Sequence, residues 1–300
     1  MAVSRTTRRA VTVIEVLVVL VVAVLAIGLA AVFIVRLRET GQRVQCENNL
    51  KLIGEAFRMY HDKSSADRAF KQLPPSRIAD GYATWAVLLA PFITSESVLK
   101  QWDVEQSYFA QKEEIRQASL IQYFCPARAR TETLSVAGDL DRTGTHFAGA
   151  LGDYAAVAGD GSADHDWTSD KANGPLIMAE LLERKDGRIV KWQSQTNLAN
   201  LKRGASIVLL VGEKHVPAGQ FGDAAVGDGS VYNGGRPANF SRVAGPGFPI
   251  APGVDAPFNK NFGSYHGNGA CPFVHADTSV LWMTPDVSED VLGQLATRGD

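Results

Sequence analysis

Residues 11–35 decide the architecture of this chain, and they read VTVIEVLVVLVVAVLAIGLAAVFIV. The last twenty of them, 16–35, carry no charged side chain and no strongly polar one. A helix of about 20 apolar residues rises about 30 Å, which matches the hydrocarbon thickness of a bilayer. Valine and isoleucine lower helix propensity in water, but lipid forces a backbone to satisfy its own hydrogen bonds. We therefore predict a membrane-spanning helix.

Glu15 lies at the start of this apolar run. Its presence helps to decide between three interpretations of the run. A cleaved secretory signal has a shorter apolar core, of roughly 7–15 residues. Here the run continues past the small residues at 28–30 to Val35. A plain signal anchor explains the length but not the carboxylate, because a charge inside a membrane segment is costly and usually functional. The third interpretation, a prepilin-type segment, accounts for the carboxylate as well.

The stretch from Arg8 to Leu17 reads RRAVTVIEVL and resembles the cleavage and methylation motif of type IV prepilins. In that family a basic leader ends in a small residue, and a peptidase cuts behind it on the cytoplasmic side. The resemblance places the cut between Ala10 and Val11, with N-methylation of Val11, and makes Glu15 the fifth mature residue. It implies that Glu15 pairs with the N-terminal ammonium of a neighbouring subunit, which offsets the burial of both charges. Ala10 replaces the usual Gly, and Val11 replaces the usual Phe.

Arginines flank the apolar run on both sides, three in residues 1–10 and three in residues 36–43. Charge alone therefore does not orient the helix. The prepilin resemblance implies a single pass through the cytoplasmic (inner) membrane, with the N-terminus in the cytoplasm and the head in the periplasm or outside the cell. The partners that it implies are the lipid bilayer, the prepilin peptidase and other pilin-like subunits.

The composition of the whole chain is that of a globular protein. Of its 300 residues, 45% are hydrophobic and 21% are charged, so the chain can bury a core. The formal net charge is −2, without a concentrated basic face, and this argues against nucleic-acid binding. The three cysteines, Cys46, Cys125 and Cys271, match no zinc spacing, and an odd number permits at most one disulfide within the chain.

A stripe of apolar residues continues the helix beyond the membrane segment, in steps of four, three, four and three. We expect this stripe to pack under a globular head and the helix to end near residues 61–62. Its members are Cys46, Leu50, Ile53, Phe57 and Tyr60. The predicted parts of the chain are a cytoplasmic leader (1–10), a transmembrane prepilin helix (11–35), its continuation packed on the head (36–62) and an exported globular head (63–300).

Short motifs follow one another along the rest of the chain: QCENNLKLIG at 45–54, WAVLLAPF at 85–92, FCP at 124–126, GDY at 152–154 and SIVLLVGEK at 206–214. Together they resemble a large bacterial family of unknown function, in the same order and over nearly the whole chain. Members of that family join a prepilin-type N-terminus to a C-terminal domain with the signature H-x9-DG. The resemblance implies a pseudopilin-like protein.

The C-terminal signature is altered in this sequence. Ten residues separate His266 from Asp277, where the family has nine, and Thr278 stands where it has Gly. We predict a hairpin over residues 266–283. Because Gly normally relieves a positive φ in such a turn, we expect Thr278 to force a different turn and the extra residue to form a bulge. The preceding residues 217–270, rich in Gly and Pro, are predicted to be long loops on the head surface.

Two site hypotheses remain open. Cys46 and Cys125 both fall in family motifs, and a disulfide between them would tie the helix to the head; two buried reduced thiols are the alternative. The acidic loop with Asp160, Asp164 and Asp166 is the best metal candidate, because clustered carboxylates suit Ca²⁺. A solvated loop is the favoured interpretation of that stretch, and no cofactor is expected.

No catalytic pattern stands out. The six histidines form no metal-ligand spacing, and the sequence has no nucleophile elbow, phosphate-binding loop or dinucleotide fingerprint. Cys271 and His275 would lie about 13 Å apart on a strand, too far for a thiol–imidazole pair. We therefore expect a protein that is not an enzyme.

The predicted fold is α+β and pseudopilin-like, with a long N-terminal transmembrane helix that continues into a head with an antiparallel sheet and long loops. The predicted function is that of a structural or assembly protein of a pilus or type II secretion-type system. A membrane-tethered module that binds a solute or carbohydrate is the alternative, and a deep pocket lined by aromatics such as Trp167 and Trp192 would favour it. A second alternative, an envelope enzyme, requires titratable side chains that converge in a cleft.

Overall fold

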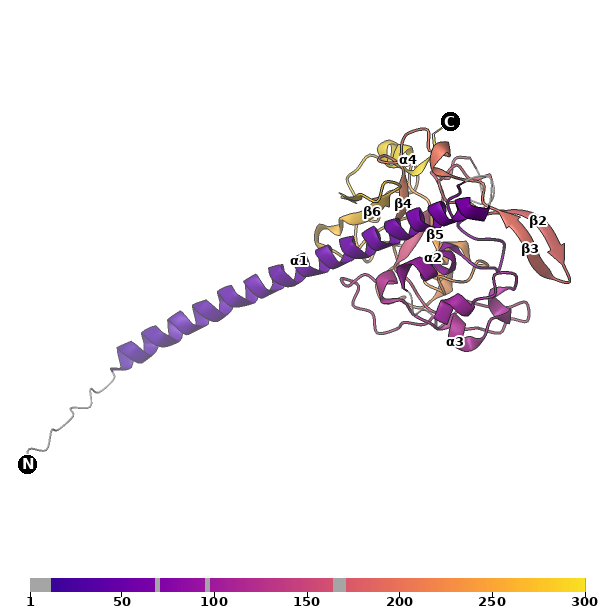
Figure 1. The fold of residues 1–300 in the computed structure, drawn as a ribbon. Coiled ribbons are helices and arrows are strands. Elements are labelled where there is room, and N and C mark those ends of the chain that lie inside the picture. Colours follow the sequence, from indigo (N-terminus) through magenta and orange to yellow (C-terminus); the bar gives the residue numbers. More distant parts are fainter. Residues whose placement is uncertain (1–11, 68–70, 95–97, 164–170, 300) are drawn as a thin grey trace, which may run out of the picture. The chain divides into compact units, whose positions relative to one another are not determined.

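The computed structural model describes residues 12–67, 71–94, 98–163 and 171–299. Its described part is α+β, with one long N-terminal helix, a five-stranded sheet and a separate two-stranded sheet (Figure 1). The chain divides after Gly41 into two compact units, residues 1–41 and 42–300.

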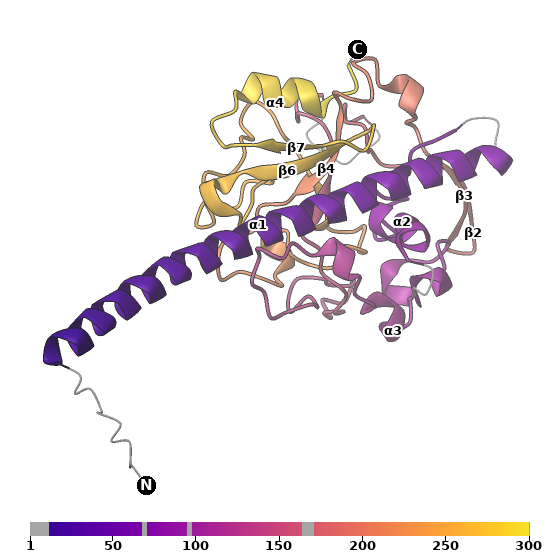
Figure 2. The ribbon, with the colours of Figure 1, turned by 60° about the vertical axis from the view of Figure 1, so that its left-hand side comes forward.

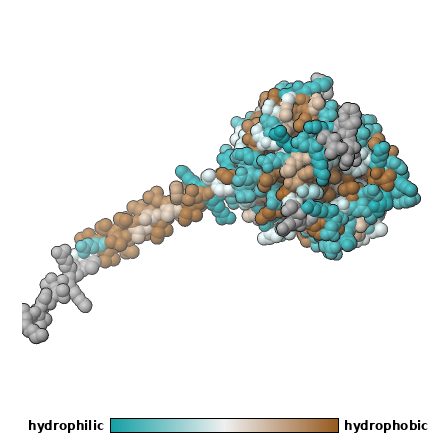
Figure 3. All heavy atoms as spheres, viewed as in Figure 1, coloured by the Kyte–Doolittle hydropathy of each residue, from teal (hydrophilic) through white to brown (hydrophobic). Residues whose placement is uncertain are grey.

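Helix α1, Val13–Asp67, is 55 residues long and ends five residues beyond the position that the sequence predicts. In the first unit its large apolar side chains, from Val13 to Leu37, are exposed all around the helix. Figure 3 shows one face of this apolar stretch. By length and composition this stretch is able to cross a membrane. A helix at the surface of a soluble protein is typically apolar on one side only, and this stretch departs from that pattern.

In the second unit the predicted stripe of α1 is buried as expected, except that Tyr60 at its end is only partly buried. Cys46, Leu50 and Ile53 are fully buried, and Phe57 is 1% exposed. The Phe57 ring stacks on Trp85 of helix α2, Trp85–Ile93, with 6.0 Å between ring centroids. This contact fastens the C-terminal part of α1 to the WAVLLAPF motif at residues 85–92. A shorter helix, α3, follows at Glu113–Arg116.

The large sheet is mixed, with the strand order β5-β1-β4-β6-β7. Strands β4 and β6 pair antiparallel, as do β1 and β4, but β1 and β5 run parallel. The prediction of a purely antiparallel sheet is therefore wrong at this edge, because the long connection between β1 and β5 lets the chain return in the same direction. The strands are β1 Tyr154–Val157, β4 Leu209–Glu213, β5 Ser241–Arg242, β6 Cys271–His275 and β7 Val280–Met283.

The second sheet is an exposed hairpin of β2, Glu180–Lys185, and β3, Arg188–Gln193. Its two-residue turn is Asp186-Gly187, with φ of 49° and 78°. Two positive φ angles in an Asp-Gly pair are typical of a tight hairpin turn whose twist matches that of the strands. The hairpin points away from the rest of the head (Figure 1).

The predicted C-terminal hairpin is present, and its paired residues are in regular register from Cys271 opposite Met283 to Val274 opposite Val280. The expected change of turn is wrong, because Thr278 itself adopts the left-handed φ of 77° that Gly would supply. Asp277 holds this turn, since its Oδ1 accepts hydrogen bonds from the Ser279 amide at 2.9 Å and the Ser279 hydroxyl at 2.6 Å.

Figure 2 shows the second half of α1 beside β6, with the closing helix α4, Glu289–Ala296, nearby. Ser288 is the N-cap of α4, but its side chain makes no capping hydrogen bond. At the contact of α1 with the hairpin, a Cβ added to Gly54 would lie 2.8 Å from Val274 Cγ2. A glycine here lets the helix approach the sheet closely.

Residues 217–270 are not only surface loops, contrary to the prediction. Val231, Tyr232 and Phe240 of this segment are fully buried. Gly234 allows the segment to enter the core, because a Cβ there would lie 2.2 Å from the Tyr82 carbonyl oxygen. The segment therefore forms part of the core without regular secondary structure over most of its length.

Candidate functional site

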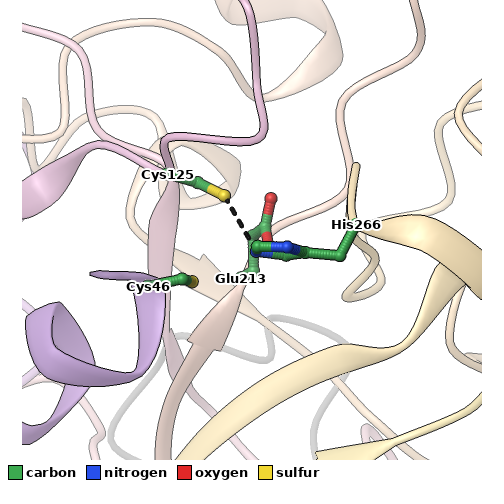
Figure 4. A group of neighbouring side chains, drawn as sticks. All are labelled: Cys46, Cys125, Glu213 and His266. Carbon is green, nitrogen blue, oxygen red and sulfur yellow. Dashed lines mark hydrogen bonds and ion pairs between the residues drawn. The ribbon is translucent and has the colours of Figure 1, made fainter. Parts of the chain in front are cut away.

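Four side chains of metal-binding type meet in the core of the head (Figure 4). They are Cys46, Cys125, Glu213 and His266, and one ligand atom from each lies within 4.8 Å of all the others. All four residues are buried. We call this set the Cys–His–Glu cluster.

Each member of the cluster comes from a different structural element. Cys46 lies on the buried stripe of α1, and Glu213 is the last residue of β4. Cys125 lies in an irregular segment between α3 and β1, and His266 lies directly before a short turn of 3₁₀ helix at Gly267–Gly269. The cluster therefore exists only when helix, sheet and loops are assembled.

Two hydrogen bonds hold the Cys125 segment against α1. The Asn49 side-chain amide donates to the Phe124 carbonyl at 2.9 Å, and the Gln42 amide donates to the Pro126 carbonyl at 3.1 Å. These contacts lie on both sides of Cys125. They fix its sulfur next to the face of α1 that carries Cys46.

The contacts inside the cluster are short. Cys125 Sγ lies 3.3 Å from His266 Nε2, and that nitrogen lies 3.9 Å from Glu213 Oε2. Cys46 Sγ lies 3.2 Å from the Tyr154 hydroxyl. Among the described residues, Glu213 Oε2 and His266 Nδ1 are buried atoms without a hydrogen-bond partner. A buried carboxylate oxygen without a donor is unusual and calls for a physical explanation.

Behind the cluster lies a network of buried ion pairs. Arg128 donates to Glu213 Oε1 and to Asp153 Oδ1, both at 3.1 Å, and all three side chains are fully buried. The network continues through Asp228, which accepts from Arg130 at 2.9 Å and lies 3.2 Å from Lys214 Nζ. Buried charges are tolerated when each has a partner of opposite sign, as here.

The protonation states of the cluster follow from burial. Burial raises the pKa of the Cys125 thiol well above its usual range. Burial, with the positive charges of Arg43 and Arg128, lowers the pKa of His266 to about 4. At neutral pH the pair is a thiol beside a neutral imidazole, whereas a catalytic cysteine needs a thiolate and an accessible position. The geometry therefore does not favour a nucleophilic cysteine.

The low pKa of His266 predicts how stability depends on pH. The unfolded chain titrates near 6.5 and the folded ring only near 4, so the unfolded state binds more protons between these values. Stability should therefore fall as the pH drops from 6.5 to 5, by about 1–2 kcal/mol from this residue. Burial also lowers the pKa values of His215 and His275, so these residues should add to the loss of stability as the pH drops.

Urea unfolding of the full chain in detergent, with a chelator present, measures this pH profile. His266→Gln should flatten the profile between pH 6.5 and pH 5, because glutamine does not titrate. A variant with the same slope as the wild type would show that His266 is not the titrating group.

The structure gives Glu15 a local contact. Its carboxylate Oε2 accepts from the Thr12 amide at 2.8 Å, and Thr12 Oγ1 accepts from the Glu15 amide at 3.3 Å. This reciprocal pair is a capping box at the start of α1. The sequence spacing T-x-x-E could have indicated it. Ala10 and Val11, the residues of the predicted cleavage site, lie outside the described residues.

The structure brings Cys46 and Cys125 together, as the disulfide hypothesis requires, but as unbonded thiols. The disulfide stays a prediction. The third cysteine, Cys271, is also an unbonded, buried thiol, and it contacts the Glu213 carbonyl at 3.4 Å.

The two ends of the altered C-terminal signature have different roles in the structure. His266 belongs to the cluster, whereas Asp277 fixes the hairpin turn.

Of the candidate calcium ligands, Asp160 accepts hydrogen bonds from the Ser162 amide at 2.9 Å and from the Asn173 side chain at 2.8 Å. Asp164 and Asp166 lie outside the described residues, so the calcium hypothesis also stays a prediction.

Sequence reasoning did not identify Glu213 and His266 as neighbours of the thiols. The available signal was indirect, because each of the four cluster residues falls in one of the separate family motifs. No spacing rule applies to residues 46, 125, 213 and 266, because consecutive members are 53 to 88 residues apart.

The described surface of the head has an open pocket of about 320 Å³. None of the described residues that line it is aromatic. Trp192 lies on the exposed hairpin, half-buried, and Trp167 lies outside the described residues. The lining residues are Asp160, Arg203, Pro246, Asp290, Gly293, Gln294 and Thr297.

Comparison with known proteins finds one family. A family model described as "Protein of unknown function (DUF1559)" matches residues 36–289. No curated protein and no solved structure matches the chain. The matched range contains the whole Cys–His–Glu cluster and begins after the apolar stretch 16–35.

Proposed function

The chain belongs to the DUF1559 family of proteins of unknown function, and from this premise we propose a membrane-anchored structural or assembly protein. It acts in a pilus or type II secretion-type system and is not an enzyme. Its N-terminus lies in the cytoplasm, its helix crosses the inner membrane once, and its head lies in the periplasm or outside.

One observation carries this proposal: the first part of α1 exposes large apolar side chains on every face and has a single carboxylate, Glu15, within its first turn. An all-round apolar helix is stable in lipid or among other such helices. The valines and leucines provide lateral contacts to neighbouring copies. The carboxylate provides a fixed register, because it would be costly in lipid without a partner.

The capping box requires only a hydrogen-bond acceptor at Glu15, whereas pairing with the ammonium of a neighbouring subunit requires its negative charge. A substitution that keeps the acceptor and removes the charge therefore distinguishes the two roles. Glutamine can also serve in a capping box but carries no charge. In Glu15→Gln we therefore expect the helix to persist and the yield of cross-linked multimers to fall about tenfold, equivalent to about 1.4 kcal/mol. The measurement is cross-linking of C-terminally tagged full-length protein in its own membrane.

Thr12→Ala is the matched control. It removes the hydroxyl that caps the Glu15 amide but leaves the carboxylate charged. Multimers should persist in this variant. If Glu15→Gln assembles like the wild type while Thr12→Ala does not, the carboxylate is a helix cap and the assembly proposal fails.

Processing is tested separately by the intact mass of the protein extracted from membranes. We expect a chain that starts at Val11 and carries one methyl group. An uncut chain that starts at Met1, or a start near Ala31, would exclude prepilin processing.

The two alternatives receive less support. A solute- or carbohydrate-binding module requires a deep pocket with aromatic walls, and the described pocket of the head has none among its lining residues. An envelope enzyme requires accessible titratable groups, whereas the Cys–His–Glu cluster is buried and its thiol is not activated.

A further inference from the structure

We propose that the Cys–His–Glu cluster is a four-coordinate structural site for a zinc-class divalent metal ion. The ligands would be the two thiolates of Cys46 and Cys125, His266 Nε2 and one carboxylate oxygen of Glu213. The proposal concerns the head alone, and its failure would leave the membrane-anchor proposal untouched.

The donor set fits this class of ion. Thiolate sulfur and imidazole nitrogen are the ligands that zinc prefers, and a carboxylate commonly completes the set. Hard ions such as Ca²⁺ and Mg²⁺ take oxygen ligands instead and would not use two sulfurs. Four protein ligands without an open position are typical of a structural rather than a catalytic zinc site.

The distances are close to those of a tetrahedral site. Zinc–sulfur bonds of about 2.3 Å and zinc–nitrogen bonds of about 2.0 Å give ligand-to-ligand distances of about 3.3–3.8 Å. Cys125 Sγ and His266 Nε2 already lie 3.3 Å apart, and all four ligand atoms lie within 4.8 Å of one another. The widest ligand-to-ligand separation therefore exceeds the tetrahedral range by at most about 1 Å.

Glu213 provides the independent observation. One of its oxygens, Oε1, accepts from Arg128 at 3.1 Å. The other, Oε2, is buried beside His266 Nε2, at 3.9 Å, without a hydrogen-bond partner among the described residues. A cation at the centre of the cluster satisfies this oxygen.

Charge balance also favours a cation. Two thiolates and a carboxylate carry three negative charges against two positive charges on the metal. The remaining negative charge lies next to Arg128, whose guanidinium contacts Glu213 directly. Binding releases the two thiol protons to solvent, so the site forms without any redox step.

A disulfide between Cys46 and Cys125 is the competing arrangement. It would use both sulfurs, but it would leave Glu213 Oε2 and His266 Nε2 without a bonding partner in the core. The metal satisfies all four groups at once, and for this reason we favour it.

The test is a metal titration of the full chain, purified in detergent, reduced and stripped with a chelator. Cobalt(II) replaces zinc and reports tetrahedral thiolate coordination through its charge-transfer and visible bands. We expect one cobalt per chain, displaced by one zinc. Cys125→Ser and His266→Gln should each weaken binding by at least about 100-fold, the upper range for the loss of a supporting group.

The chain offers matched controls for both variants. Cys271→Ser removes a buried thiol that contacts the Glu213 backbone but lies outside the cluster. His275→Gln removes another buried histidine. Both should bind cobalt like the wild type. Circular dichroism of every variant verifies folding, and Cys46→Ser provides a second ligand variant if Cys125→Ser does not fold.

Three results would overturn the proposal. One is a reduced, folded wild-type protein that binds neither cobalt nor zinc. Another is binding that survives in the ligand variants. The last is a Cys46–Cys125 disulfide in protein that was alkylated at the moment of cell lysis, since those sulfurs would not be free to bind metal.

Discussion

Replacing Arg128 by methionine should lower the free energy of unfolding by about 3–5 kcal/mol, the usual cost of breaking a buried ion pair. Arg128 is fully buried and donates to Asp153, to Glu213 and to the Lys214 carbonyl, the last at 2.6 Å. Methionine fills a similar volume but supplies no charge and no donor. The Glu213 carboxylate would then lose the Arg128 donor at Oε1 and would have to take up a proton or remain charged in the core.

Arg188→Met is the matched control for this change. Arg188 also bridges two carboxylates, Asp103 at 2.7 Å and Glu105 at 3.0 Å, but its side chain is 39% exposed. Exposed ion pairs contribute about 0–1 kcal/mol, because water solvates the separated charges well. Urea unfolding of both variants in detergent compares them. Equal losses would show that burial does not set the strength of these contacts.

Trp85→Ala should lower the free energy of unfolding by about 3–5 kcal/mol, because it removes the largest fully buried side chain among the described residues and leaves a cavity. The indole packs edge-on against Tyr123, with 5.6 Å between ring centroids, and stacks on Phe57 of α1. Its Nε1 donates to the Phe240 carbonyl at 2.8 Å. One side chain therefore joins the helix, the segment before Cys125 and the segment before β5.

Trp192→Ala is the control, since Trp192 is only half-buried, on the exposed hairpin. Substitutions at such partly exposed sites cost about 1 kcal/mol or less. Thermal unfolding followed by circular dichroism distinguishes the two variants. A small loss for Trp85→Ala would mean that the core rearranges to fill the cavity.

These contacts bear on how the head is attached to its anchor. The part of α1 from Gln42 onward carries Cys46, the buried stripe and the partner of Trp85. The cluster adds ligands from β4 and from two loops to the same helical face.

Local periodicity explains what could be predicted from the sequence. The apolar run before Val35 and the stripe from Cys46 to Tyr60 each depend on residues within a few turns of one another. Such patterns predict helices and strands because side-chain direction repeats every 3.6 or 2 residues. The C-terminal hairpin over residues 266–283 was also predicted, although Thr278 takes a backbone conformation that its residue type disfavours.

The sequence by itself thus determined an apolar N-terminal helix, its buried continuation, an α+β head and the two ends of the C-terminal hairpin. Only the tertiary structure decided the parallel pairing of β1 with β5, the burial of residues 217–270 and the meeting of Cys46, Cys125, Glu213 and His266. These features depend on contacts between residues far apart in the chain. Their physical cause is the packing of whole elements against one another, which no local period of the sequence encodes.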